Sequence, residues 1–157
     1  MNVYIVCSPG GHLTQALNAL ETFEGCDVFL VTLDFPNLRD ISLKGIKKIH
    51  RVRLRFDYSM SLGVPVTLFL SFFQMIGLFL RKRPHIIFST GSEIAIPAFL
   101  AGKLFFRTKL IFMESLTRIQ ELSLTGKVLY RFADLFLVQW EGLAGRVSNA
   151  VYKGRLI

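Results

Sequence analysis

A glycine-rich turn that ends in a histidine follows the first apolar run of the chain. The run, Val3–Cys7, is typical of a buried strand, and Ser8-Pro9-Gly10-Gly11-His12 comes directly after it. Two glycines let a ligand approach the backbone, and free N–H groups at the start of a following helix attract anions. Histidine changes its charge near neutral pH, so His12 is suited to take a proton from a hydroxyl group. A helix-capping role for His12 is the structural alternative, because the turn is neither a GxGxxG fingerprint nor a P-loop.

Two further polar turns, Thr90-Gly91-Ser92-Glu93 and Glu114–Arg118, each follow another short apolar run. The carboxyl ends of parallel strands meet at one edge of a sheet, where open α/β sheets bind their ligands. We therefore expect the three turns to bring His12, Glu93 and Glu114 to one edge. Each turn also has a structural alternative, because Ser92 could cap a helix and Glu114 could pair with Arg118.

Several kinds of chemistry are disfavoured by what the sequence lacks. It has no Asp-x-Asp motif of metal-dependent sugar-nucleotide enzymes and no Gly-x-Ser-x-Gly elbow, and its three His and two Cys are too scattered for a zinc site. We therefore expect no metal and no cofactor. We also expect no nucleic-acid partner, because no basic segment is interleaved with aromatic residues.

The elements that must position these turns are predicted as alternating strands and helices. Short, continuously apolar strands separated by helices indicate a parallel sheet covered on both faces, and the length predicts a single domain, residues 1–157. The predicted strands are Val3–Cys7, Asp27–Leu33, Gly45–Val52, His85–Ser89, Lys109–Met113 and Leu135–Gln139. The predicted helices are Leu13–Phe23, Val66–Leu80, Ile94–Phe105 and Thr125–Ala133, the last capped by Ser123 or Thr125.

The composition combines an apolar with a basic character. Hydrophobic residues make up 52% of the chain, and 19 basic against 11 acidic residues give a net charge of +8. The apolar content excludes intrinsic disorder, and the combination indicates an anionic membrane surface at least as much as nucleic acid. The first residues resemble no targeting segment, so we expect a cytosolic protein whose Cys7 and Cys26 remain thiols.

One segment stands out because residues 58–80 contain no charge. Its length could span a membrane, but Gly63 and Pro65 shorten the helix, and Thr67 and Ser71 belong to a narrow polar stripe. We expect residues 66–83 to contact the membrane surface, with a buried core helix and a true span as alternatives. The predicted membrane-contacting residues are Phe69, Phe72, Phe73, Ile76 and Phe79, followed by Arg81, Lys82 and Arg83 at the headgroup phosphates.

Three further motifs, Phe112–Arg118 (FMESLTR), Leu122–Lys127 (LSLTGK) and Ala133–Trp140 (ADLFLVQW), complete a specific pattern. Together with the first two turns they resemble the asparagine-linked-glycosylation protein fourteen family and its bacterial exopolysaccharide counterparts such as PssD. The motifs occur in the order of the family and extend over nearly the whole chain.

The resemblance implies a Rossmann-like parallel sheet that forms the amino-terminal, acceptor-binding half of a split GT-B glycosyltransferase. A separate donor-binding protein would supply the carboxy-terminal half, and the chain would be inactive without it. The implied substrates are a UDP-sugar and a polyprenyl-diphosphate-linked sugar, and the implied location is peripheral, at the cytoplasmic face of the membrane. Eukaryotic members carry an amino-terminal transmembrane anchor; because this sequence starts at its first strand, we expect Val66–Arg83 to make the membrane contact.

The resemblance also implies roles for individual residues. His12 is the expected catalytic base, with Glu93 as the alternative. A non-catalytic scaffold, which only recruits the donor-binding subunit to the membrane, is the alternative function. The expected acceptor-binding residues are Gly10, Gly11, Gly91, Ser92, Glu114 and Arg118. The expected partner-contacting residues are Trp140, Tyr152, Gly154 and Leu156.

Overall fold

The fold is seen in a computed structural model that describes residues 1–34, 44–52 and 63–156. The strands are β1 (Asn2–Val6), β2 (Asp27–Leu33), β3 (Lys48–Val52), β4 (Ile86–Ser89), β5 (Lys109–Met113), β6 (Leu135–Val138) and β7 (Ala150–Tyr152). The α-helices are α1 (Gly11–Asn18), α2 (Gly63–Arg81), α3 (Ala95–Ala101), α4 (Leu124–Leu129) and α5 (Glu141–Ala144). A 3₁₀ turn, η1 (Leu20–Phe23), and a π-helical turn, η3 (Gly102–Phe106), complete the elements.

Every predicted strand and helix is present, and the differences are at the ends. The predicted first helix is divided into α1 and η1. The helix predicted to end at Phe105 finishes as the π-helical turn η3, closed by Arg107 in the left-handed conformation. Ser123 is confirmed as the cap of α4, because its side chain accepts a hydrogen bond from the Gly126 N–H. The elements β7 and α5 were missed, because three and four residues are too few for a periodic signal.

All seven strands run parallel in the order β3-β2-β1-β4-β5-β6-β7, which confirms the predicted fold class. The chain winds outward from β1 in one direction and from β4 in the other. The two strands pair directly, with Val3 beside Ile86 and Ile5 beside Phe88. A crevice forms at the carboxyl end of such a switch point because the loops after the two central strands diverge.

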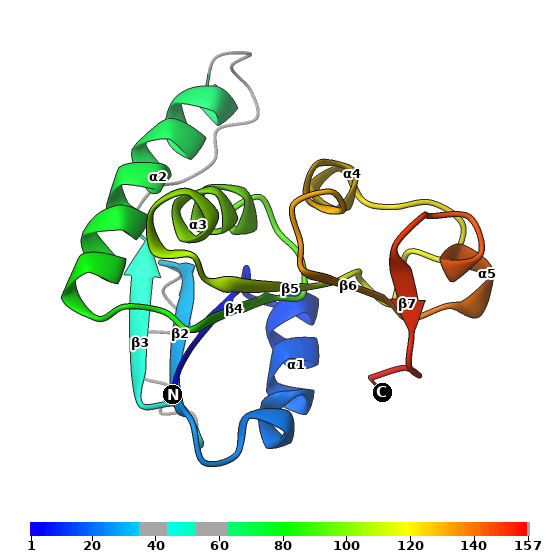
Figure 1. Cartoon of the computed structure of the whole chain (residues 1–157), viewed down its shortest axis with the longest axis horizontal. Helices are drawn as coiled ribbons and strands as arrows, with labels where there is room; N and C mark the ends of the chain where they lie inside the picture. Colours follow the sequence, from blue (N-terminus) through cyan, green and yellow to red (C-terminus); the bar gives the residue numbers. More distant parts are fainter. Residues whose placement is uncertain (35–43, 53–62, 157) are drawn as a thin grey trace.

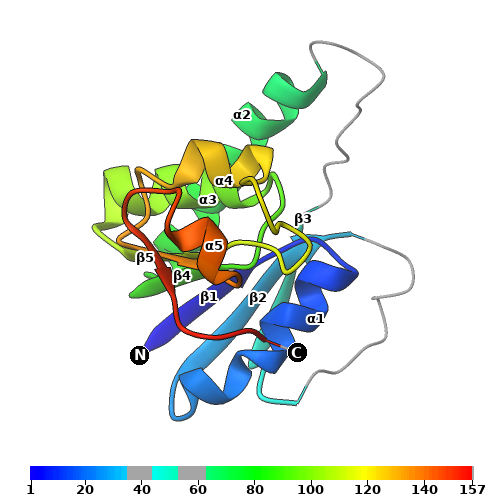
Figure 2. The same ribbon diagram turned by 90° about the vertical axis from the view of Figure 1, so that its right-hand side faces the viewer.

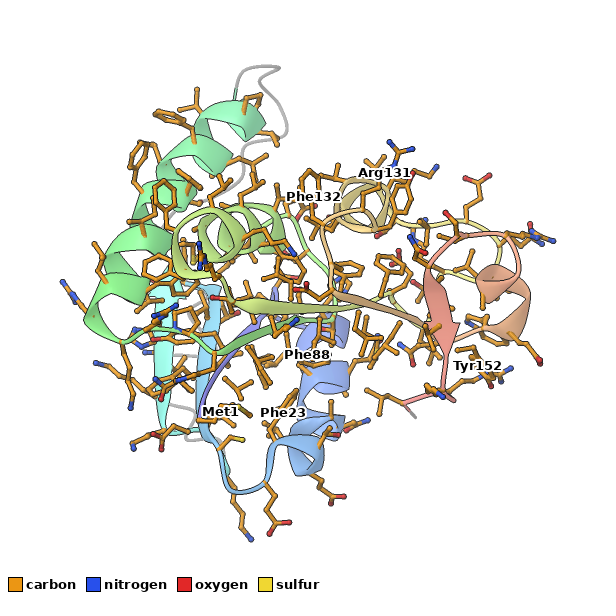
Figure 3. The ribbon with its side chains drawn as sticks, viewed as in Figure 1. Met1, Phe23, Phe88, Arg131, Phe132 and Tyr152 are labelled. Atoms are coloured by element: carbon orange, nitrogen blue, oxygen red, sulfur yellow. The ribbon has the colours of Figure 1, made fainter. Side chains whose placement is uncertain are left out.

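Helices cover the two faces of the sheet unequally (Figure 1). Helix α1 and the turn η1 cover one face, where the rings of Phe23 and Phe88 lie 5.4 Å apart (Figure 3). Helices α2, α3 and α4 cover the other face, over a larger core in which Phe112 stacks on Phe136 at 5.1 Å. The sheet is therefore buried on both sides, as its continuously apolar strands require.

Helix α2 carries large apolar side chains on its outer face. Phe69, Phe73 and Leu80 are 63%, 54% and 73% exposed, and Val66 and Leu70 lie on the same face. We call these five residues the apolar face of α2. The helix is long and apolar enough to cross a membrane by length and composition, and only 22% of its most apolar window is buried. An apolar face of this kind, uncovered in the described chain, is a feature of interaction surfaces rather than of core helices.

The inner face of α2 is formed by Thr67, Ser71, Met75 and Phe79, one at every helical turn. The polar stripe noted in the sequence thus faces the protein at Thr67 and Ser71. These small side chains let α2 pack closely against α3, whose alanines are fully buried. The helix is therefore inverted relative to an ordinary surface helix, which turns its polar side outward.

This arrangement corrects part of the predicted membrane set. Phe79 is fully buried, with its ring 5.1 Å from that of Tyr4 and 5.6 Å from that of Phe106, so it belongs to the core. Phe72 and Ile76 are half-buried and pack against the same core. The prediction failed at Phe79 because an almost uniformly apolar helix does not reveal which side faces the sheet.

Lys82 also differs from its prediction. Its ammonium lies 3.3 Å from an Asp27 carboxylate oxygen and 4.8 Å from the centre of the Phe29 ring. Hydrogen bonds from Lys47 and Lys82 lower the pKa of Asp27. Lys82 is therefore engaged within the protein. Arg81 and Arg83 are exposed, and Arg83 also donates a hydrogen bond to the Phe106 carbonyl at 2.9 Å.

Candidate functional site

A cleft of about 270 Å³ lies at the carboxyl edge of the sheet, at the switch point between β1 and β4. Its wall brings together residues from all three polar turns, as the sequence predicted, and from the start of α4. His12, Glu93 and Arg118 are its ionisable residues. Its hydroxyl groups belong to Ser8, Ser92, Ser115, Thr117, Ser123 and Thr125. A wall so rich in hydroxyl groups can exchange hydrogen bonds with a polyol, and the arginine can bind an anionic group.

His12 is held in a defined orientation by the turn after β4. It lies in the first turn of α1, and its Nδ1 is 2.8 Å from the carbonyl oxygen of Thr90. The Thr90 hydroxyl donates in return to the carbonyl of His12, at 2.7 Å. A carbonyl oxygen only accepts, so Nδ1 carries the proton and Nε2 of the neutral ring keeps a free lone pair. An imidazole held in this way can accept a proton at Nε2 from a hydroxyl group.

Gly91 makes room for this imidazole. Its φ is +123°, a conformation that favours glycine, and a Cβ at this position would lie 2.5 Å from Cε1 of His12. Gly91 is also buried. The prediction that Gly91 contacts the acceptor is therefore corrected, because its position supports the His12 ring.

The two glycines before His12 are exposed, as an anion site would require. Gly10 has a φ of +90°, and a Cβ on Gly10 or Gly11 would meet no atom within 4 Å in the described chain. No side chain of the described residues caps the start of α1. The first N–H groups of this helix are therefore open to a ligand.

Ser92 and Glu93 both line the cleft. Ser92 has a φ of +89°, which is rare for a residue with a side chain, and its hydroxyl lies 3.4 Å from the Glu93 carboxylate. The N-cap residue of α3 is Ile94, and the Ser92 side chain makes no cap hydrogen bond to the helix, so the structural alternative for Ser92 is wrong. A strained backbone that turns a polar side chain into a cleft is a recurrent feature of functional sites.

Glu114 holds the cleft wall together from behind. It is 1% exposed, and one carboxylate oxygen accepts the Ser115 N–H at 2.9 Å. The other accepts the N–H and the hydroxyl of Ser123, at 2.9 and 3.0 Å. The expectation that Glu114 binds the acceptor is corrected, since its carboxylate is already engaged by these donors. Arg118 is exposed at the cleft and has no ion pair with Glu114, so that structural alternative is wrong too.

The predicted partner-contacting residues lie at the β7 edge of the sheet, and two of them make contacts within the chain. Trp140 donates its indole N–H to the Leu116 carbonyl at 2.7 Å, and the Arg155 guanidinium covers its ring at 3.7 Å. Leu156 packs against the core on the α1 side, to which the C-terminal segment returns (Figure 2). Tyr152, on edge strand β7, is half-buried. Gly154 turns the segment with a φ of +110°.

Sequence reasoning missed the residues that support the site from behind. Gln15 and Gln139 are far apart in the sequence, and their roles depend on a hydrogen bond of 2.6 Å from Gln139 Nε2 to Gln15 Oε1. No local signal could have identified them. One signal in the sequence could have identified the hydroxyl groups of Ser8, Thr117 and Thr125 as cleft residues. These residues lie directly after predicted strands or at a predicted helix cap. No group of three or more His, Cys, Asp or Glu that could hold a metal ion occurs in the part of the chain that the structure describes.

Comparison with known proteins identifies related sequences. Residues 37–156 match the family model described as "Oligosaccharide biosynthesis protein Alg14 like". A Schizosaccharomyces pombe protein named UDP-N-acetylglucosamine transferase subunit alg14 is 32% identical over 92% of this chain and 78% of its own length. The Mus musculus protein of that name is 32% identical over 100% of this chain and 83% of its own. A Candida albicans protein of that name is 37% identical, but the match spans 60% of this chain and 45% of the relative.

Solved structures confirm the fold. The crystal structure of Acinetobacter baumannii MurG superposes with a TM-score of 0.75 at 19% identity, over 97% of this chain and 45% of that one. A UDP-N-acetylglucosamine 2-epimerase from Rickettsia bellii superposes with a TM-score of 0.71 at 11% identity, over 99% of this chain and 45% of its own. The chain thus spans about half the length of these neighbours.

Proposed function

This chain belongs to the Alg14-like family of oligosaccharide biosynthesis proteins, and from that premise we propose that it is the acceptor-binding subunit of a two-component glycosyltransferase. The transferase moves a sugar from a UDP-sugar to a polyprenyl-diphosphate-linked sugar. Residues 1–157 form its acceptor-binding domain. A second chain with the carboxy-terminal half of a GT-B enzyme binds the donor, and the subunit alone is inactive.

The observation that carries this proposal is the oriented His12 in a hydroxyl-lined cleft. The Thr90 carbonyl fixes the tautomer of the imidazole and leaves its Nε2 free, and His12 is part of the cleft wall. A sugar acceptor presents hydroxyl groups, which such a wall can bind and such a base can deprotonate. The printed names of the relatives, as subunits of a UDP-N-acetylglucosamine transferase, support the reaction class.

In this mechanism the acceptor hydroxyl attacks the anomeric carbon of the UDP-sugar. His12 Nε2 takes the hydroxyl proton as the new C–O bond forms. The bond from the anomeric carbon to UDP breaks, and UDP leaves with the electron pair. Direct attack inverts the anomeric carbon. Glu93, at the same cleft, is the alternative base.

The acceptor diphosphate is bound by the open start of α1 and by Arg118. Gly10 and Gly11 leave the first N–H groups of the helix accessible, and a helix start favours an anion. Arg118 is exposed at the same cleft and supplies a cation. Ser92 completes the acceptor-binding wall.

The membrane contact is made by the apolar face of α2, at the cytoplasmic side of the bilayer. Leu104 and Phe105 of η3, which are 67% and 62% exposed, extend this surface. Arg81 and Arg83 lie at its end and contact anionic headgroups. The partner subunit contacts the other end of the molecule, along β7 and residues 153–156.

The test is a reconstituted transferase in which His12 is changed to Ala. We expect kcat to fall by about a hundredfold to ten-thousandfold, while the two subunits still co-elute. His85→Ala is the matched control, because His85 bonds to Asn2 outside the cleft. A His12→Ala complex that assembles and keeps wild-type turnover would overturn the base assignment and favour the non-catalytic scaffold, in which the partner holds all the chemistry.

A further inference from the structure

Gln139 stands at the centre of a buried hydrogen-bond network behind the cleft. It follows β6 directly and is 1% exposed. Its Nε2 donates to the Gln15 Oε1 at 2.6 Å and to the Glu114 carbonyl at 3.0 Å. Its Oε1 accepts the Leu156 N–H at 2.9 Å. One buried side chain therefore joins three parts of the chain that are far apart in sequence.

The partners of Gln139 admit one orientation of its amide. The Glu114 carbonyl can only accept a hydrogen bond, and the Leu156 N–H can only donate one. Rotating the amide by half a turn would place two acceptors together at Glu114 and two donors together at Leu156. A carboxylate or an apolar side chain of the same size would leave at least one buried partner unpaired, which is costly.

Two of these links lead to elements that line the cleft. Gln15 lies on α1, three residues after His12 and therefore on the same side of the helix. Its Oε1 also accepts the Leu116 N–H, at 3.3 Å. Leu116 belongs to the turn that carries Ser115 and Thr117 into the cleft. Gln139 thus ties the helix that carries His12 to the turn that carries Ser115 and Thr117.

The third link leads to the C-terminal segment, residues 153–156. Leu156 is held by its N–H to Gln139, and Arg155 lies over the Trp140 ring. Trp140 in turn donates to the Leu116 carbonyl. The segment therefore reaches the cleft wall by two routes, through Gln139 and through Trp140.

We infer that Gln139 is a positioning residue that couples the C-terminal segment to the geometry of His12 and of the 115–118 wall. Any event that fixes or displaces residues 153–156 changes the placement of the base, although none of these residues lines the cleft. The catalytic meaning of this coupling rests on the proposed function. Under that function, docking of the donor-binding subunit on the segment completes the acceptor site.

Two pairs of variants separate the coupling from simple loss of packing. Gln139→Glu keeps the shape of the side chain but removes the donor to Gln15 and Glu114, and Gln139→Leu removes every hydrogen bond. Leu156→Pro removes the N–H that Gln139 accepts, because proline has none. Leu156→Ala is its matched control, since it shortens the side chain and keeps the N–H.

The readout is the NMR signal of the His12 ring in the whole chain, labelled at its histidines and held in detergent micelles. The chain has three histidines, so the spectrum is assignable by single substitutions. We expect Gln139→Glu, Gln139→Leu and Leu156→Pro to displace the His12 signal, while Leu156→Ala leaves it near its wild-type position. His50, on β3, and His85, before β4, report on folding and should not move.

An unmoved His12 signal in Gln139→Glu and Leu156→Pro would overturn the inference. If Gln139→Leu does not fold, all three histidine signals change together. The His12 signal of Leu156→Pro then decides whether the coupling exists. In the reconstituted transferase, Gln139→Glu, Gln139→Leu and Leu156→Pro should lower kcat about tenfold to a hundredfold at an unchanged KM for the donor. The NMR result needs no activity, so it stands or falls separately from the proposed transferase.

Discussion

At the scale of single residues, the site depends on one imidazole and the backbone that surrounds it. Thr90 supplies a carbonyl that fixes the tautomer of His12, and Gly91 supplies the space for the ring. Both residues belong to the turn after β4, whereas His12 follows β1. The site therefore exists because β1 and β4 are neighbours in the sheet, although more than seventy residues separate His12 from Thr90.

Gly91→Ala is expected to displace the His12 ring, because the new methyl group would lie 2.5 Å from Cε1 and the backbone φ of +123° disfavours alanine. The loss of kcat should approach that of His12→Ala, with a changed His12 NMR signal. Gly142→Ala is the control, since a Cβ there meets no atom within 4 Å. A Gly91→Ala enzyme with normal kcat would show that the ring is not held as described.

At the scale of elements, α2 departs furthest from an ordinary α/β crossover helix. It connects β3 to β4, and its inner face packs on the sheet and on α3 through small or buried side chains. Its outer face is as apolar as a core and is uncovered in the described chain. A surface of this composition has a favourable free energy of transfer into lipid.

The triple variant Phe69→Ser, Phe73→Ser and Leu80→Ser is expected to lose binding to anionic phospholipid vesicles. Its unfolding free energy should change by less than about 2 kcal/mol, because exposed substitutions each cost little. Vesicle cosedimentation and urea denaturation measure the two effects. High salt should weaken the binding of the wild type if Arg81 and Arg83 face phosphates.

Phe79→Ser is the matched control on the inner face. It should cost about 3–5 kcal/mol of stability, because the side chain is fully buried against Tyr4 and Phe106. The interpretation of α2 as a membrane element would be contradicted by a triple variant that binds vesicles like the wild type, or by one that unfolds as Phe79→Ser does.

At the scale of the whole molecule, the three proposed surfaces lie in different places on one sheet. The cleft is at the carboxyl edge, and β7 is the edge strand at one end of the sheet. Helix α2, which carries the apolar face, lies on the side of the sheet near β3 (Figures 1 and 2). The surfaces proposed for the bilayer, the acceptor and the second chain therefore do not compete for the same part of the molecule. The edge strand at the other end of the sheet, β3, carries Lys48, a residue that discourages edge-to-edge pairing.

Global stability should depend on pH through His50. Burial first, and then the charges of Lys48 and Arg81, lower the pKa of His50 from its ordinary 6.5. The unfolded chain then binds this proton more readily than the folded protein. The stability that neutral His50 contributes is therefore fully present above about pH 6.5, and it is lost as the pH falls toward the lowered pKa of His50. Urea denaturation at pH 7.5 and 5.5 measures the difference.

His50→Phe is expected to reduce this pH dependence, because the ring still stacks on Tyr4 and contacts Phe29 while the titrating group is removed. Asp27 acts in a separate, lower window, since its lowered pKa makes its contribution disappear only as the pH falls below 3.8. An unchanged difference between pH 7.5 and 5.5 in His50→Phe would assign the effect to another group.

The sequence by itself determined the parallel α/β fold, the three turns at one edge and the family. These features are local, because a run of apolar residues or a turn motif is written in neighbouring positions. The tertiary structure alone decided which side of α2 faces outward, since a uniformly apolar helix has no polarity to orient it. It also decided that Glu114 supports the cleft and that Gln139 joins Gln15 to Leu156, because hydrogen bonds between distant residues leave no pattern along the chain.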